Sequence, residues 1–207
     1  MTLSMSRLTI VVLCFFVAAC SSTSEKFKEI EQTPTLSQNS RVKGSIDSQY
    51  DQSTIIGEAE KHFGKGAEGV ATAIEKVFSD LGKPNGYIVG QEGSGSFIVG
   101  LKAGDGTLVH AIEGSREVHW IGPSIGLETG GNFSRVFALV YNLYDTEELF
   151  ERFPAVEGNA YVIGGLSLSY HQRDDIVVVP IRLGVGLRLG ANVNYIKFSK
   201  DRTYNPF

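Results

Sequence analysis

The feature that most constrains the fold is a long succession of short strand-like segments in the second half of the chain. Turn signals such as AGDG at 103–106, EGSR at 113–116 and QRDD at 172–175 separate several of them. Most neighbouring pairs have no helical pattern between them, which predicts an antiparallel sheet rather than a series of parallel crossovers. The segments are 86–90, 95–102, 107–112, 117–122, 134–143, 160–170, 175–190 and 192–199.

Glycines recur inside these segments. A glycine weakens a flat strand but permits a sharp bend, so repeated glycines favour a sheet that coils. We therefore predict a mainly β fold with an N-terminal helical segment, in which about 8 to 10 strands form a small curled or closed antiparallel β-barrel. The glycines in question are at 90, 95, 100, 164, 165, 184, 186 and 190.

The only long helical stretch lies at 53–82, ahead of the strands. Gly64 and Gly66 are expected to divide it into a short helix and a longer one, and Gly82 is expected to end the second. Apolar residues in the second part recur at steps of three and four, so we expect this helix to cover or plug one side of the barrel. They are Val70, Ala73, Ile74, Val77, Phe78 and Leu81. A short helix is also predicted at 145–153.

The chain begins with the layout of a signal peptide. Residues 1–7 carry one positive charge, and an apolar run of about 11 residues follows, too short to cross a bilayer. Val17, Ala18 and Ala19 precede Cys20, a pattern that resembles a bacterial lipobox and implies cleavage before Cys20 and its acylation. Ser21, rather than Asp, follows the cysteine, which favours the periplasmic face of the outer membrane. The alternative is an ordinary secreted protein cut nearby, with Cys20 incidental.

Three parts are therefore expected: a lipoprotein signal peptide at 1–19, a flexible lipid-anchored tether at 20–53, and one helix-plus-barrel domain at 54–207. The tether is polar and has no sustained apolar period. Cys14 and Cys20 are the only cysteines. Because Cys14 would leave with the signal peptide, no intramolecular disulfide is expected.

The charge of the chain limits its partners. Removal of 1–19 takes away one basic residue, Arg7, and lowers the formal net charge from −4 to −5. An acidic chain without a basic cluster is a poor partner for nucleic acid and for broad electrostatic attraction to anionic lipid. Membrane contact through the lipid anchor, and an envelope lipid, glycan or protein partner, are compatible with this charge.

Two arginines and the single tryptophan are candidates to face a ligand. Arg182 and Arg188 alternate with leucine and valine in 180–190, which gives the strand one charged and one apolar face. Trp120 lies in the segment 117–122. The simpler interpretation, which we favour from the sequence, is that both arginines face solvent, because a strand with one wet face is common.

His110 and His119 are weak candidates for metal binding. If Gly114 and Ser115 form a two-residue hairpin, the two histidines lie opposite each other on one face of the sheet. Two imidazoles supply only half of a metal site, so we favour no metal and no cofactor.

Ser124 lies in GPSIG at 122–126, which matches G-x-S-x-G, and His171 follows later in the chain. A nucleophile elbow passes from a strand directly into a helix, and LETGGNFS at 127–134 is a poor helix start. Hydrolysis by Ser124 is therefore a remote alternative.

Several sequence blocks resemble the bacterial envelope-integrity protein A family. They are GKPNGYIVG at 82–90, WIGPSIG at 120–126, RVFALVYNL at 135–143, RFPAVEGNAY at 152–161, PIRLGVGLRLGAN at 180–192 and the terminal NPF. The resemblance implies a small periplasmic antiparallel barrel, needed for cell-envelope integrity, without an established enzymatic activity. A fainter resemblance to the lipid-binding SYLF domain rests on a leading helix, a glycine-rich strand block and a VFALVYN-like strand followed by a short helix.

We therefore expect a non-enzymatic envelope lipoprotein that supports envelope integrity by binding an envelope component. A phospholipid-binding or lipid-handling barrel is the alternative, in which Arg182 or Arg188 meets lipid.

The lipid anchor can be tested directly. Cys20→Ser removes the thiol that would be acylated, so the protein is expected to move from the membrane fraction to the soluble fraction, because acyl chains supply its membrane affinity. Fractionation followed by immunoblotting measures this. Sedimentation of the Cys20→Ser protein with the membrane, as for the wild type, would show that Cys20 is not the anchor.

Overall fold

The computed structural model describes residues 48–65, 67–96, 99–125, 132–183, 195–203 and 205. All of them belong to the compact unit that spans Leu36–Phe207. The predicted signal peptide, Cys20, most of the predicted tether and Arg188 lie outside the described residues.

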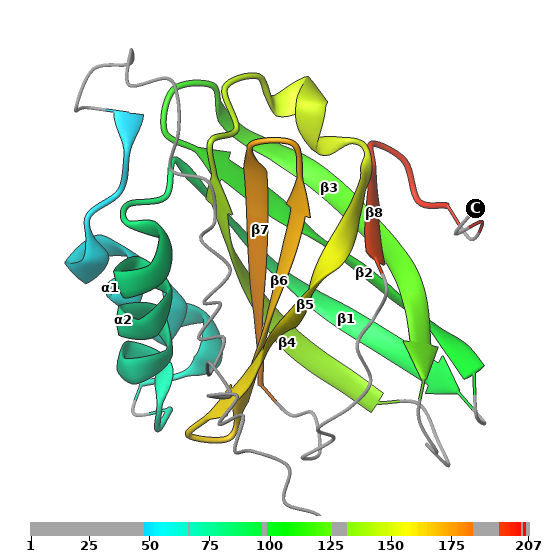
Figure 1. Ribbon diagram of the computed structural model, residues 1–207, viewed down its shortest axis with the longest axis horizontal. Helices are drawn as coiled ribbons and strands as arrows, with labels where there is room; N and C mark the ends of the chain where they lie inside the picture. The colour runs from blue at the N-terminus through cyan, green and yellow to red at the C-terminus, as the bar shows by residue number, and fades with distance from the viewer. Residues whose placement is uncertain are drawn as a thin grey trace, which may run out of the picture. The chain divides into compact units, whose positions relative to one another are not determined.

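Eight described strands form a closed antiparallel barrel, which confirms the predicted fold class (Figure 1). Their order around the barrel is β1-β2-β3-β8-β5-β6-β7-β4, and β4 pairs back with β1. The bounds are β1 Gly86–Ser96, β2 Val99–His110, β3 Gly114–Ile125, β4 Asn132–Tyr141, β5 Arg152–Ile163, β6 Leu166–Arg173, β7 Ile176–Leu183 and β8 Tyr195–Ser199.

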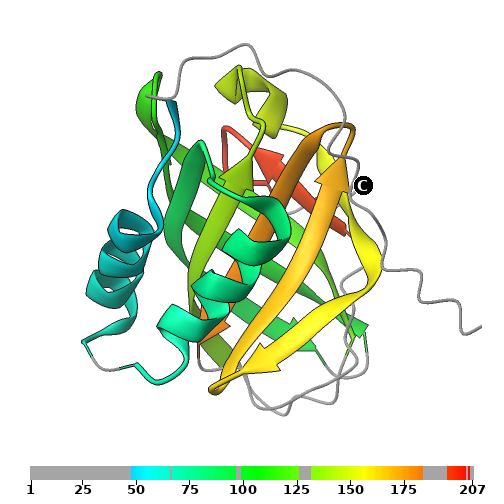
Figure 2. The same ribbon diagram turned by 60° about the vertical axis from the view of Figure 1, so that its left-hand side comes forward.

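Two helices precede the barrel and lie together on one side of it (Figure 2). Helix α1 spans Gln52–Phe63 and helix α2 spans Val70–Leu81. The glycine-rich stretch divides them as predicted, but both have 12 residues, so the second is not longer than the first. The N–H of Gly82 donates to the Phe78 carbonyl and ends α2 as expected. Neither described helix is long and apolar enough to span a membrane.

The helices bury the outer face of one side of the barrel. The predicted apolar face of α2 packs there, with Val70, Ala73, Ile74 and Val77 fully buried. One polar contact helps to hold the helix in place, because Tyr170 on β6 donates its hydroxyl to Asp80 Oδ2 at 2.6 Å. Barrel residues in this outer core include Tyr87, Phe137, Leu139, Tyr141, Leu166, Leu168, Tyr170, Val177, Val179 and Ile181.

A second core fills the interior of the barrel, which we call the lumen. It is formed by Ile88, Leu108, Val118, Trp120, Val136, Ala138, Val140, Leu143, Leu149, Phe153, Ile176, Val178, Ile196 and Phe198. Successive residues of a strand point to opposite faces, so one strand can contribute to both cores. On β4 and β7, both faces are therefore apolar.

Three predicted connections differ from the structure. The turn expected at 103–106 lies inside β2, which joins two expected strands into one. The segment 160–170, expected as one strand, is a hairpin that turns at Gly164 and Gly165, whose φ angles are 55° and 80°. The helix expected at 145–153 is a single 3-10 turn, η2, at Thr146–Leu149, and Arg152 already belongs to β5.

Within the part of the chain that the structure describes, strand β8 is the shortest in the barrel and has the shortest ladders. It forms three residue pairs with β3 and three with β5, whereas β1 pairs with β2 along eleven residues. It also lies on the side of the barrel away from the helices (Figures 1 and 2). Strand β8 therefore completes the barrel with few backbone hydrogen bonds and without a covering helix.

Candidate ligand site in the barrel lumen

An ion pair lies inside the barrel. Glu92 comes from β1 and Arg182 from β7, and their side chains are only 4% and 5% exposed. Arg182 Nε donates to Glu92 Oε1 at 3.1 Å, and Nη2 lies 3.4 Å from Oε2. Both residues face inward because Glu92 is in phase with Ile88 and Arg182 with Val178, at even spacing along their strands.

Trp120 on β3 completes this arrangement. Its Nε1–H donates to Glu92 Oε2 at 3.1 Å. Its ring lies against the backbone of β1 and β2, where a Cβ on Gly104 would be 2.2 Å from the ring and a Cβ on Gly90 would be 2.7 Å from it. Gly90 and Gly104 therefore serve to admit the indole ring, which is a different role from the strand bending expected for Gly90.

Ser169 and His171 on β6 extend the network. Arg182 Nη1 donates to Ser169 Oγ at 3.1 Å. His171 Nδ1 lies 3.3 Å from the Phe153 carbonyl, which can only accept, so Nδ1 carries the ring proton. His171 Nε2 then accepts from the Ser169 hydroxyl at 3.1 Å. We call Glu92, Arg182, Trp120, Ser169 and His171 the lumen cluster.

Burial acts on the pKa of both titrating members of the lumen cluster. Desolvation alone would raise the pKa of Glu92, but the charges of Arg182 and Lys102 outweigh it. Hydrogen bonds from Arg182 and Trp120 act in the same direction, so the pKa of Glu92 is lowered and the carboxylate stays ionised. Desolvation, assisted by the charge of Arg182, lowers the pKa of His171 to about 3. His171 is therefore neutral at neutral pH.

The contact between Ser169 and His171 has the spacing of a nucleophile and its base, but its surroundings oppose that chemistry. A general base works best with a pKa near the operating pH, and the pKa of His171 is far below it. An imidazolium at this position would also be repelled by Arg182. The arrangement is suited to holding hydrogen-bonding groups in fixed positions rather than to transferring a proton.

A small cavity lies beside the lumen cluster. Seven of its eight lining residues are apolar, and the eighth is Arg182. Its volume of about 10 Å³ is about the room that one water molecule needs. The lining residues are Ile88, Trp120, Val136, Ala138, Pro180, Arg182, Ile196 and Phe198.

The structure brings together two of the three residues expected to face a ligand. Arg182 and Trp120 both bind Glu92 inside the barrel. The favoured expectation that Arg182 faces solvent is wrong, because the strand closes into a barrel and its charged face points into the lumen. Arg188 lies outside the described residues.

His110 and His119 do not form a pair. The hairpin between β2 and β3 has a three-residue loop at 111–113, so His110 pairs with Gly114, and His119 pairs with Asp105. His110 Nδ1 accepts from the Glu113 N–H, and its Nε2 lies 2.7 Å from the Leu143 carbonyl, at one end of the lumen. Among the described residues, no group of three His, Cys, Asp or Glu side chains could hold a metal.

Sequence reasoning missed Glu92 and Ser169, and it considered His171 only as the histidine of the hydrolase alternative, not as a lumen residue. A signal existed for Glu92, because an ionisable residue in phase with inward apolar residues on a strand is unusual. No such signal existed for Ser169 and His171. On β6 the outward residues Leu166, Leu168 and Tyr170 are apolar because the helices cover them, so the polar residues that face the lumen look solvent-exposed in the sequence.

Comparison with known proteins identifies the family of this chain. The model of the family described as Envelope integrity protein A matches residues 48–207, which include the whole lumen cluster. The chain belongs to the envelope integrity protein A family. It is similar to a crystal structure described as a beta-barrel-like, uncharacterized protein from Brucella abortus, with a TM-score of 0.71 and 46% sequence identity, over 77% of this chain and 99% of that chain. A search of curated proteins found no match.

The ion pair in this envelope integrity protein A domain can be tested through stability. Arg182→Met leaves Glu92 buried without its partner and should lower the free energy of unfolding by about 3–5 kcal/mol. The double variant Glu92→Met/Arg182→Met should cost less than Arg182→Met alone, because no buried charge remains. Chemical denaturation measures both.

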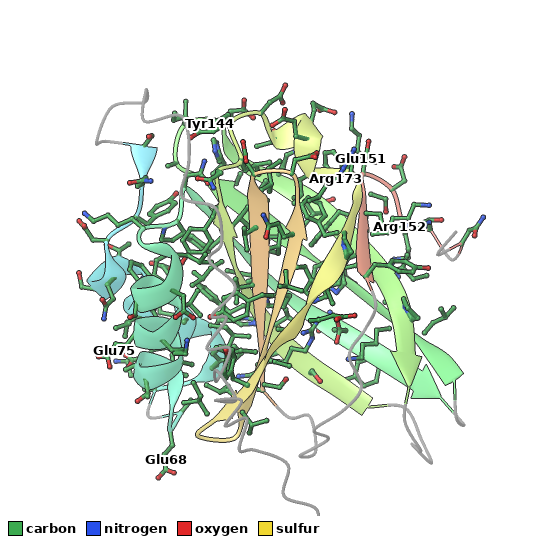
Figure 3. The ribbon with its side chains drawn as sticks, viewed as in Figure 1. Glu68, Glu75, Tyr144, Glu151, Arg152 and Arg173 are labelled. Carbon is green, nitrogen blue, oxygen red and sulfur yellow. The ribbon has the colours of Figure 1, made fainter. Side chains whose placement is uncertain are left out.

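Arg173→Met is the matched control for this experiment. Arg173 on β6 pairs with Glu151 at the surface, at 3.0 Å, and both side chains are partly exposed (Figure 3). Its loss should cost at most about 1 kcal/mol. If the cost of the double variant equals the sum of the costs of Arg182→Met and of Glu92→Met, each measured alone, a direct coupling between Glu92 and Arg182 is contradicted.

The buried histidine predicts a pH dependence of stability. Between about pH 6.5 and its folded pKa of about 3, His171 binds a proton in the unfolded state but not in the folded state. Stability therefore falls as pH falls, by about 2 kcal/mol between pH 7.5 and 5 from this residue. His171→Asn should flatten this dependence in denaturation curves, whereas Gln172→Asn, on the opposite face of β6, should retain it. Equal slopes in both variants would mean that His171 is not the group responsible.

Proposed function

We propose that this chain is a non-enzymatic lipoprotein on the periplasmic face of the outer membrane, which supports envelope integrity by binding an envelope component at the barrel lumen. The envelope role is supported by the family match over 48–207. The binding role rests on one observation, the ion pair of Glu92 and Arg182 beside a cavity that is otherwise apolar.

The free-energy cost of burying two charges supports a binding role for this ion pair. Two apolar side chains of similar volume would commonly fill the same space with equal or greater stability, since desolvation of two charges is expensive. The fold therefore has no evident need for Glu92 and Arg182 inside the barrel. A polar group in an otherwise apolar pocket is the usual arrangement by which a protein orients a bound molecule.

The proposal of a non-enzymatic protein is supported by the surroundings of the two serines that could serve as nucleophiles. Ser124 lies one residue before the end of β3 and pairs with Gly100, so it is part of a strand ladder and not of a strand-to-helix turn. Ser169 contacts a histidine whose pKa is too low for general base catalysis at neutral pH.

A lipid-handling barrel is a second candidate, and one observation favours it. The cavity combines a guanidinium with seven apolar residues, which is the pairing that an amphiphile requires. The cavity volume of about 10 Å³ is too small for an acyl chain in the described conformation. Lipid handling therefore requires a change in the barrel wall.

The proposed function can be tested by complementation. In a strain that lacks this protein, the wild type should restore exclusion of a membrane-impermeant DNA dye. Ser124→Ala should restore it equally, and Glu92→Met/Arg182→Met should fail although the protein is folded and abundant, because it lacks the polar groups of the lumen. Arg173→Met is the control that should restore dye exclusion.

Two outcomes would contradict this proposal. Full complementation by the double lumen variant would exclude the ion pair from function. Failure of a folded Ser124→Ala protein would instead revive the hydrolase hypothesis.

A further inference from the structure

The cavity beside the lumen cluster is bounded on one side by β8. Its two inward side chains, Ile196 and Phe198, line the cavity together with Trp120 and Arg182, and Phe198 is the direct ladder partner of Trp120 on the neighbouring strand β3. Phe198 also packs against the Trp120 ring, with 6.2 Å between ring centroids. Displacement of this single strand would therefore enlarge the cavity and uncover both the indole ring and the guanidinium.

Strand β8 is the part of the barrel wall that can be displaced with the least disruption. Among the described residues, three residue pairs hold it on each side, with one further backbone hydrogen bond from the Phe198 N–H to the Glu151 carbonyl, whereas the β2–β3 ladder has twelve pairs. Contacts at the surface also involve this strand and the residue that follows it. Arg152 lies over the Tyr195 ring at 4.5 Å (Figure 3), and just after β8 Lys200 pairs with the exposed Glu147. Local opening preferentially involves segments with few ladder hydrogen bonds, which describes β8 although its inward residues Ile196 and Phe198 are buried in the lumen core.

The chemistry of the uncovered surface specifies a ligand class. Glu92 and Ser169 together accept from three of the five N–H groups of Arg182. Among the described residues, no other acceptor is bonded to Arg182, so two N–H groups remain for oxygen atoms of a ligand. The rest of the cavity lining is apolar and includes the flat ring of Trp120.

We propose that β8 is the opening strand of the barrel, and that its displacement admits an amphiphile with an apolar part against Trp120 and head-group oxygens on Arg182. This proposal rests on the proposed binding function and names its ligand class and its route of entry. The acceptor oxygens could belong to a phosphate or to a sugar, and the choice of probes separates these two sources.

Trp120 is the only tryptophan of the chain, so its fluorescence reports on this site. The chain from residue 20 onward carrying Cys20→Ser has no cysteine and no acyl anchor, and it is titrated with single-chain amphiphiles below their micellar concentrations. Dodecyl phosphate or dodecyl maltoside, which both carry acceptor oxygens, should give a saturable shift of the emission. Dodecyltrimethylammonium, which has no acceptor, should give at least a tenfold weaker response.

A disulfide across the β3–β8 ladder tests the route of entry. His119 and Ser199 pair on the outer face of the barrel, so His119→Cys/Ser199→Cys in the same chain would fix β8 to β3. Oxidation of this variant should weaken the probe response at least tenfold, and reduction should restore it. The matched control is Thr107→Cys/Glu117→Cys, an exposed pair on the β2–β3 ladder, which should bind equally well when oxidised and reduced.

Each result decides one part of the proposal. A response to phosphate alone or to maltoside alone identifies the head group. Equal responses to all three amphiphiles, or none, overturn the lumen site, and undiminished binding by the oxidised His119→Cys/Ser199→Cys variant overturns entry at β8. The titration needs neither the anchor nor the envelope. If the protein binds the probes normally in vitro but does not restore dye exclusion in cells, the proposed envelope function is rejected and the site is not.

Discussion

Closure of eight strands leaves a lumen just wide enough for side chains to fill, and the rest of the structure depends on how this space is filled. Trp120 lies in this space, and glycines on β1 and β2 make room for its ring. The indole N–H must then find an acceptor away from water, and Glu92 supplies it. A buried carboxylate in turn requires a cation, which is Arg182. Trp120 thus explains the two glycines and the need for an acceptor, but a neutral acceptor would satisfy the indole N–H equally well, so it does not explain why two charges are buried here.

The fold class could be predicted from the sequence because it depends on local signals. The glycines around α1 and α2 and the apolar period of α2 are examples, and both match the structure. The two faces of the sheet could not be told apart. Helices cover the outer face, so Leu168 outside and Val178 inside are equally buried, and alternation of polar and apolar residues does not separate lumen from exterior. The turn predicted at AGDG, residues 103–106, is also wrong. Gly104 makes room for the Trp120 ring and does not form a turn.

The candidate site could be predicted only in part. Arg182 and Trp120 attract attention as a charge and a large aromatic residue within strands, but neither indicates its partner. Their meeting at Glu92 depends on pairing between β1 and β4 and between β4 and β7, which brings together positions ninety residues apart. The expected pair of His110 and His119 is wrong because the chain turns at 111–113 rather than at Gly114 and Ser115, so His119 pairs with Asp105, five positions from His110. A register shift by an odd number of residues moves side chains to opposite faces of the sheet.

The position of β8 in the chain has a consequence for the order of folding. Residues 195–199 complete the barrel by pairing with residues 119–121, about eighty positions earlier in the chain. The ladders between β1 and β2 and between β2 and β3 join neighbouring segments and can form as soon as those segments emerge, whereas closure must wait for nearly the whole polypeptide. A chain that crosses a membrane from its N-terminus would therefore remain an open sheet during transit and become a barrel only after its last strand arrives.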